Sequence, residues 1–302
     1  MPFAPHSRAR IASNLVQQDL SNPSRGISHE QYNAGPPADT LDFVQELIDA
    51  NKDLWEQLVN NEFCAKMAAG TASLDGFRYY MIQDTLYLQN YVRYKLGLFQ
   101  KAQNWDDLSQ AATSIKNDVD FANDQLTVCV EKLGVPKDIV LGTAMNHDMM
   151  DYTMFEDQEA LTDDWFSLHV VLLPCLVGYY KIAKKLDEDT ATLKNTVFYD
   201  IWISGNLDDS SAKKSRDFCN TNAAQWQSPI QKQKWTSLFR HACEMEIKAF
   251  HIGVQAPSPY MTIPDETYYC IVNSSGQVAV DLENSDFTAK TQDKSESHGI
   301  WS

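Results

Sequence analysis

The chain has 302 residues, of which 43% are hydrophobic, and a formal net charge of −16 at pH 7. This length suffices for one large domain with a buried core or for two small ones. The acidic balance argues against a nucleic-acid or anionic-membrane partner and favours a small-molecule partner.

Three regions differ in composition along the chain. Residues 1–37 are rich in proline and polar residues and are predicted to form a flexible, disordered N-terminal arm. Residues 38–254 carry apolar side chains at helical spacing, which predicts an all-α domain. Residues 255–302 form an extension in which two β-prone runs, 268–272 and 277–280, flank a Ser-Gly turn. A small hairpin is expected there, followed by a polar, disordered tail after Asp286.

The helices of the middle region are predicted from apolar spacing and from proline and glycine stops. Asp39 or Thr40 is the expected N-cap of the first helix. The predicted helices cover residues 38–58, 73–101, 106–133, 137–141, 143–160, 165–182, 193–204, 208–226 and 229–254.

Cys175 stands out in the apolar run 165–182, because Pro174 precedes it and is expected to bend the helix there. Tyr179 follows one turn later on the same helix face. The thiol and the phenol would therefore point into the same space. A buried cysteine is also a common small core residue, so this pattern alone does not decide between a core and a reactive site.

Asp84 lies within the apolar stripe of the predicted helix 73–101, with Tyr87 on the same face. A buried carboxylate is costly unless it is paired or binds something. The carboxylate would either bind a ligand or tie this helix to a neighbour through a backbone amide or an arginine.

Glu246 lies between apolar positions of the predicted helix 229–254, although Glu244 or Glu246 could equally face solvent. Tyr152 is a further aromatic hydroxyl on an apolar helix, where a core role is the simpler interpretation.

Two sequence strings, residues 76–88 (GFRYYMIQDTLYL) and 172–180 (LLPCLVGYY), resemble the F-x-Y-Y-x-x-Q-D-x-x-Y-L and L-P-C-x-x-x-Y signatures of the TenA/thiaminase II family. This family has the haem-oxygenase-like helical fold, and the resemblance covers roughly residues 50 to 254. It implies a homo-oligomer, a tetramer or a dimer, and a pocket for an aminopyrimidine.

The resemblance also implies roles for individual residues. Cys175 matches the nucleophile that adds to the pyrimidine ring, Asp84 matches the carboxylate that binds the ring's amino group, and Glu246 resembles the acid/base residue. The tyrosines that match site-lining positions are Tyr87, Tyr152 and Tyr179. The implied reaction is cofactor-independent hydrolysis that releases hydroxymethylpyrimidine from thiamin or from its aminomethyl decay product.

Two positions depart from the family pattern. Asn206 stands where the family usually has a tyrosine, and Ala249 stands where it has a phenylalanine. Both changes are expected to enlarge the pocket or to make its lining more polar. Two alternatives therefore stay open: a TenA-like enzyme for a different substrate in specialised metabolism, or a non-catalytic pyrimidine-binding homologue.

Other chemistries fit the sequence less well. No metal site is predicted, because the six cysteines include no Cys-x-x-Cys pair. His147, His169, His241 and His251 are not joined to carboxylates at ligand spacing on core faces, and His169 is predicted to be a core or interface residue. No apolar run reaches the length of a membrane helix without charges close by, and no secretory signal is visible. A cytoplasmic location is expected.

Overall fold

The computed structural model describes residues 42–255, 278–281 and 288–291. The chain divides into two compact units, with the boundary between residues 260 and 261. The predicted arm at residues 1–37 lies outside the described residues.

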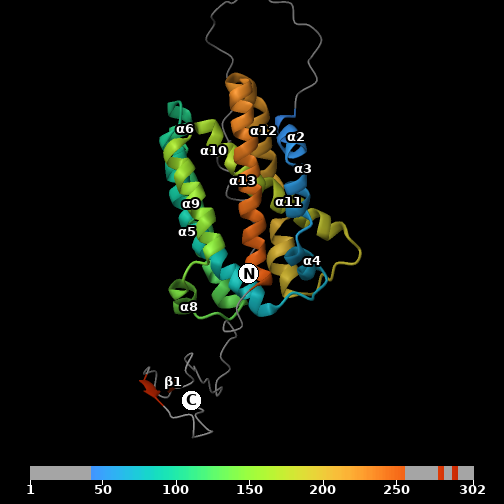
Figure 1. The fold of residues 1–302 in the computed structure, drawn as a ribbon, viewed down its shortest axis with the longest axis vertical. Helices are drawn as coiled ribbons and strands as arrows, with labels where there is room; N and C mark the ends of the chain where they lie inside the picture. The colour runs from blue at the N-terminus through green and yellow to red at the C-terminus, as the bar shows by residue number, and fades with distance from the viewer. Residues whose placement is uncertain (1–41, 256–277, 282–287, 292–302) are drawn as a thin grey trace, which may run out of the picture. The chain divides into compact units, whose positions relative to one another are not determined.

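The described part of the first unit is built of helices (Figure 1). The all-α fold class predicted from the sequence is thus confirmed. The α-helices are α2 (Phe43–Ala50), α3 (Lys52–Val59), α4 (Glu62–Ala68), α5 (Leu74–Gln100), α6 (Trp105–Ser109), α7 (Ala111–Thr127), α8 (Lys137–Gly142), α9 (His147–Thr162), α10 (Trp165–Val171), α11 (Leu173–Glu188), α12 (Ser210–Trp226) and α13 (Pro229–Val254). Shorter segments are the π-helices η1 (Val128–Lys132) and η2 (Tyr199–Ile203) and the 3₁₀-helix η3 (Ser204–Asn206).

The two longest helices begin at serine caps. The Ser73 side chain accepts a hydrogen bond from the Gly76 amide at the start of α5 (3.2 Å), and Ser228 accepts one from the Gln231 amide at the start of α13 (3.2 Å). Pro229 occupies the first turn of α13, where its missing N–H costs nothing. The predicted helices 73–101 and 229–254 are confirmed to within a residue.

The first predicted helix, 38–58, is wrong as a single element. It is divided at Asn51 into α2 and α3, and the N-cap of α2 is Asp42. The predicted caps Asp39 and Thr40 lie outside the described residues. The Asn51 amide donates to the carbonyls of Leu47 (3.0 Å) and Thr236 (3.2 Å), so a tertiary contact to α13 fixes the break. The short helix α4 was not predicted.

The run 165–182 contains a break where the sequence predicts a bend. Leu172 separates α10 from α11, and Pro174 stands in the first turn of α11. By length and composition, Trp165–Glu188 could cross a membrane, with a mean hydropathy of 1.5 in its most apolar window, contrary to the expectation from the sequence. However, 89% of that window is buried inside the bundle, as in the core helix of a globular domain.

The predicted helix 193–204 forms only in its second part, as η2 and η3. The Leu193 amide donates to the carbonyl of Ala68 (2.9 Å), which holds this stretch against the end of α4. The Thr196 hydroxyl then accepts from the Tyr199 amide (3.1 Å) and starts the helical segment. A long-range backbone contact thus overrides the local helical pattern.

In the second unit, β1 (Val278–Asp281) pairs antiparallel with β2 (Thr288–Thr291), with Val278 opposite Thr291. The predicted strand 277–280 is therefore present, but its partner is β2, in the stretch predicted to be disordered. Thr288 and Thr291 are β-branched and favour a strand. The partner expected from the sequence, residues 268–272, lies outside the described residues.

α13 is the central helix of the first unit. It packs against α2, α3, α4, α5, α9, α10 and α11. α5 and α9 lie on one side of it and α11 on the other (Figure 1). Glycines allow α5 and α13 to approach closely, because a Cβ on Gly76 of α5 would lie 2.3 Å from the Gly253 carbonyl oxygen of α13.

His169 is buried in α10, as predicted, with its Nδ1 2.7 Å from the Trp165 carbonyl and its ring against Phe218 (4.2 Å between centroids). Burial lowers the pKa of His169 to about 4.

A pH-dependent loss of stability follows from this burial. Between pH 6.5 and 4, His169 becomes protonated in the unfolded chain but stays neutral in the folded chain. The free energy of unfolding is therefore expected to fall by about 3 kcal/mol over this window on account of this residue. Urea unfolding of wild type and His169→Gln at several pH values tests this. A variant with the same acid slope as wild type would contradict it.

Candidate functional site

Residues from α5, α9, α11 and α13 meet inside the bundle. Cys175 and Asp84 are 4% and 5% exposed, and Glu246 is completely buried. The predicted site-lining tyrosines are buried as well: Tyr87, Tyr152 and Tyr179. All these side chains come from helices, so helix packing fixes their positions.

Two tyrosine–glutamate pairs lie side by side in this interior. The Tyr152 hydroxyl donates to Glu246 Oε1 (2.7 Å), and the Tyr87 hydroxyl donates to Glu156 Oε1 (2.8 Å). The centroids of the two tyrosine rings are 4.9 Å apart. Glu246 is thus a buried carboxylate and not part of a solvated face. Its second oxygen, Oε2, is buried and has no hydrogen-bond partner among the described residues.

Glu156 was not predicted as a site residue. It is completely buried and lies one turn after Tyr152 on α9. That i, i+4 spacing puts it on the same helix face, which is the sequence signal that could have identified it.

The structure ties Asp84 to the neighbouring helix α7. The Gln125 amide donates to Asp84 Oδ2 (2.9 Å). One partner is therefore a side-chain amide, a type that the sequence did not suggest. The interhelix tie and a ligand-binding role are compatible, because one carboxylate accepts several hydrogen bonds.

Tyr179 lies one turn after Cys175 on α11, within an aromatic cluster. Its hydroxyl is 3.2 Å from the Tyr80 hydroxyl, and its ring packs against Phe250 (4.9 Å between centroids) and Trp202 (5.5 Å). This cluster lies one helical turn from Cys175 along α11.

Electrostatics place the thiol and the tyrosine–glutamate pairs in one environment. Burial, together with the charges of Glu246, Glu156 and Cys175 and with Tyr87, raises the pKa of Tyr152 well above its usual value. Tyr152 therefore keeps its proton at neutral pH and donates a hydrogen bond to Glu246.

Asn206, the predicted substrate-binding residue of η3, is 8% exposed. Its Nδ2 donates to the Trp202 carbonyl (2.7 Å), and its buried Oδ1 accepts no hydrogen bond from the described residues. Its connection to the cluster runs through the Trp202 ring, which packs on Tyr179. Its role in binding stays a prediction.

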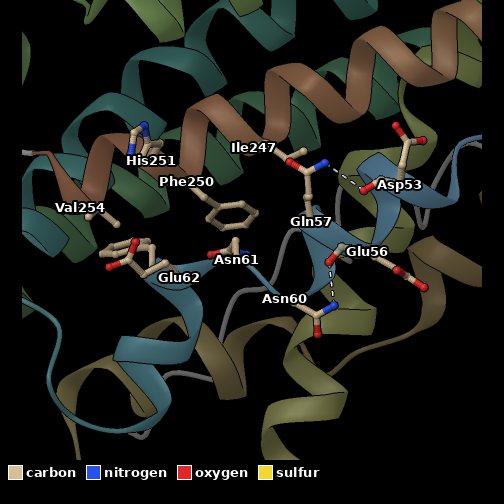
Figure 2. Close-up of a pocket in the computed structure, with 11 residues that line it drawn as sticks. Asp53, Glu56, Gln57, Asn60, Asn61, Glu62, Ile247, Phe250, His251 and Val254 are labelled. Carbon is tan, nitrogen blue, oxygen red and sulfur yellow. Dashed lines mark hydrogen bonds between the residues drawn. The ribbon is translucent and has the colours of Figure 1, made fainter.

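Two surface grooves flank α13, and neither is lined by Cys175, Asp84 or Glu246. One, of about 580 Å³, lies between α3, α4 and α13 (Figure 2). Phe250 lines this groove and also packs against Tyr179, so its ring separates the groove from the buried site. The other, of about 820 Å³, lies between α3, α9 and α13.

Among the described residues, one group has the proximity that a metal ion requires. Donor atoms of His147, Asp148 and Asp151 lie within 4.8 Å of one another at the exposed start of α9. Asp151 is already paired with Lys248 (3.1 Å). The group shares no residue with the buried site, and none of its members was predicted as a metal ligand.

Comparison with known proteins gives consistent similarities. The model of the TENA/THI-4/PQQC family matches residues 48–250. An uncharacterised Haemophilus influenzae protein is 26% identical over 215 residues, 70% of this chain and 98% of that protein. An aminopyrimidine aminohydrolase from Halalkalibacterium halodurans is 24% identical over 164 residues, 54% of this chain and 72% of that protein.

Solved structures show the same fold. A TenA family transcription regulator from a Silicibacter species has a TM-score of 0.62 at 21% identity, covering 70% of this chain and 96% of that chain. Fungal relatives are much longer: this chain matches only 29% of the length of a Saccharomyces cerevisiae hydroxymethylpyrimidine/phosphomethylpyrimidine kinase.

Proposed function

We propose that this chain, which belongs to the TENA/THI-4/PQQC family, is a hydrolase that releases hydroxymethylpyrimidine from an aminomethylpyrimidine or from thiamin. The observation that carries the proposal is the buried Tyr152–Glu246 hydrogen bond in the helical interior that also buries Cys175. A buried thiol and a buried carboxylate share this interior, which supports a nucleophilic role for Cys175 and an acid/base role for Glu246. The relative named as an aminopyrimidine aminohydrolase supports the substrate class.

The reaction then proceeds in two halves. The Cys175 thiolate adds to a ring carbon of the pyrimidine, and the ring's π electrons expel the amine from the methylene carbon. Glu246, held by Tyr152, gives its proton to the departing amine. Glu246 next takes a proton from water, the resulting hydroxide adds to the exocyclic methylene, and the returning electrons expel the thiolate. Asp84 accepts a hydrogen bond from the ring's amino group throughout.

The test is hydrolysis of 4-amino-5-aminomethyl-2-methylpyrimidine and of thiamin, with hydroxymethylpyrimidine quantified by mass spectrometry. Wild type is expected to turn over at least one compound, and Cys175→Ser is expected to lose at least about 10³-fold in kcat. Cys219→Ser is the matched control, because it removes another buried thiol, on α12. Absence of turnover by folded wild type with both compounds would refute the assignment.

A second candidate keeps this chemistry and changes the substrate. Asn206 and Ala249 stand where the family has aromatic residues, and the buried Oδ1 of Asn206 is an acceptor available to a ligand. A different or bulkier aminopyrimidine would then be the substrate. A reactive Cys175 combined with no hydrolysis of either test compound would favour this candidate.

A further inference from the structure

Glu156 is a buried carboxylate that the proposed reaction does not use. It is completely buried on α9, and its Oε1 accepts a hydrogen bond from the Tyr87 hydroxyl of α5 (2.8 Å). The bond joins two helices of the site through residues that are 69 positions apart. Because a hydrogen bond to a carboxylate is stronger than one to a neutral acceptor, it holds the phenol hydrogen firmly.

The Tyr87 ring is held in place by its neighbours. Its centroid is 4.9 Å from that of Tyr152 and 6.1 Å from that of Tyr91. This packing fixes the direction of the C–O bond, so the position of the hydroxyl hydrogen is the freedom that remains. A phenol has one hydrogen to donate, and Glu156 accepts it. The Tyr87 oxygen can therefore offer only lone pairs to a ligand.

The neighbouring tyrosine–glutamate pair has the same polarity. Tyr152 donates its hydrogen to Glu246 Oε1 (2.7 Å), so its oxygen also offers only lone pairs. Glu246 is the group that gives a proton to the departing amine in the proposed reaction. Its buried Oε2 has no hydrogen-bond partner among the described residues. Two phenols that act only as acceptors thus lie in the ring pair that holds the leaving-group acid.

The two test compounds differ in what they present to such acceptors. The leaving group of the aminomethylpyrimidine is a primary amine, which carries N–H donors. The leaving group of thiamin is a thiazole, whose ring nitrogen carries no hydrogen. A site built to accept hydrogen bonds from N–H groups disfavours a compound that lacks them, because polar groups of the site then stay unpaired.

We propose that Glu156 is a positioning residue that sets the specificity of the site. By holding the Tyr87 hydrogen, it leaves the Tyr87 oxygen to accept a hydrogen bond from an N–H of the leaving amine. No covalent bond changes at either residue. The proposal rests on the proposed function, in which Tyr87 lines the site and the amine departs beside Glu246.

The test is the ratio of kcat/KM for the aminomethylpyrimidine to kcat/KM for thiamin, measured with the full chain. Glu156→Leu removes the acceptor and frees the Tyr87 hydrogen, so the ratio is expected to fall about five- to fiftyfold. Glu156→Gln removes the charge but keeps an acceptor oxygen, and its ratio is expected to stay within about twofold of wild type. Tyr87→Phe is expected to match Glu156→Leu, and the double variant is expected to show no further loss.

Asp157→Asn is the matched control. Asp157 follows Glu156 on α9 and also accepts a hydrogen bond from α5, but the donor is the Asn90 amide (3.1 Å) and not a phenol. Its ratio is expected to equal that of wild type. Thermal melting establishes that each variant is folded. If Glu156→Leu does not fold, Glu156→Gln and Tyr87→Phe decide the question.

Several results would overturn the proposal. An unchanged ratio in folded Glu156→Leu or in Tyr87→Phe would do so, and so would an additional loss in the double variant. A loss in Glu156→Gln as large as that in Glu156→Leu would show that the charge matters and not the held hydrogen. An equal loss in Asp157→Asn would assign the effect to the α5–α9 contact in general.

A binding measurement separates this proposal from the proposed function. Calorimetric titration of both compounds into Cys175→Ser, with and without Glu156→Leu, gives the same preference without turnover. If wild type hydrolyses neither compound, the proposed reaction fails, and the binding ratio still decides the role of Glu156. Absence of binding of both compounds would overturn both proposals.

Discussion

Glu246→Gln is expected to lower kcat for hydrolysis by about 10²- to 10⁴-fold, with a much smaller change in KM. Glutamine keeps the size of the side chain and can still accept the hydrogen bond from Tyr152, but it cannot give or take the proton that both halves of the reaction need. The loss should therefore fall on the chemical steps. Steady-state kinetics with the better of the two test compounds give the measurement.

The matched control for this change is Glu244→Gln. Glu244 lies on the same helix two residues earlier, but its side chain is 43% exposed and it lies 3.8 Å from Arg240. Kinetic constants within about twofold of wild type are expected for it. Equal losses in the two variants would show that charge on α13, and not a proton at Glu246, governs the rate.

Gly76→Ala is expected to reduce the free energy of unfolding by about 3 kcal/mol, the upper part of the range for overpacking a close contact. Its new Cβ would lie 2.3 Å from the Gly253 carbonyl oxygen, and a backbone atom cannot rotate away as a side chain can. The clash can be relieved only if α5 and α13 move apart. Since these helices carry Asp84 and Glu246, the variant should also lose activity.

Gly142→Ala makes the same substitution where a new Cβ meets no atom within 4 Å, at the end of α8. It is expected to be neutral or to stabilise the fold by about 0.5–1 kcal/mol, through a less flexible unfolded chain. Urea unfolding of both variants checks the pair. Similar midpoints for both would disprove the close-contact explanation.

Local signals were sufficient for the two longest helices but not for the predicted helix 106–133, which is divided into α6, α7 and η1, nor for the short helices. Ser73 and Ser228 mark the starts of α5 and α13 in the sequence, and apolar spacing carries each helix to its end. The stretch that begins at Leu193 has a helical pattern as well, but the Leu193 amide donates to the carbonyl of Ala68, which is distant in the sequence. No periodicity within the stretch could reveal that contact.

The same limit applies to the site. Cys175, Asp84 and Glu246 could be singled out because each interrupts or marks an apolar face, and the sequence strings around the first two resemble a known family. Gln125 and Glu156 could not be paired with their partners from sequence, because 41 residues separate Gln125 from Asp84 and 69 separate Glu156 from Tyr87. The catalytic roles of all these residues stay predictions until the variants are measured.

The central place of α13 has a consequence for synthesis of the chain. This helix packs against most others of the bundle, yet it is the last helix of the first unit to leave the ribosome. The apolar faces of the earlier helices therefore stay exposed during synthesis until α13 is available to cover them. Cys175 is translated before Glu246, so the nascent chain holds a thiol without its proton-transfer partner. Completion of the core and assembly of the site are therefore expected to be one event, after residue 254 has emerged.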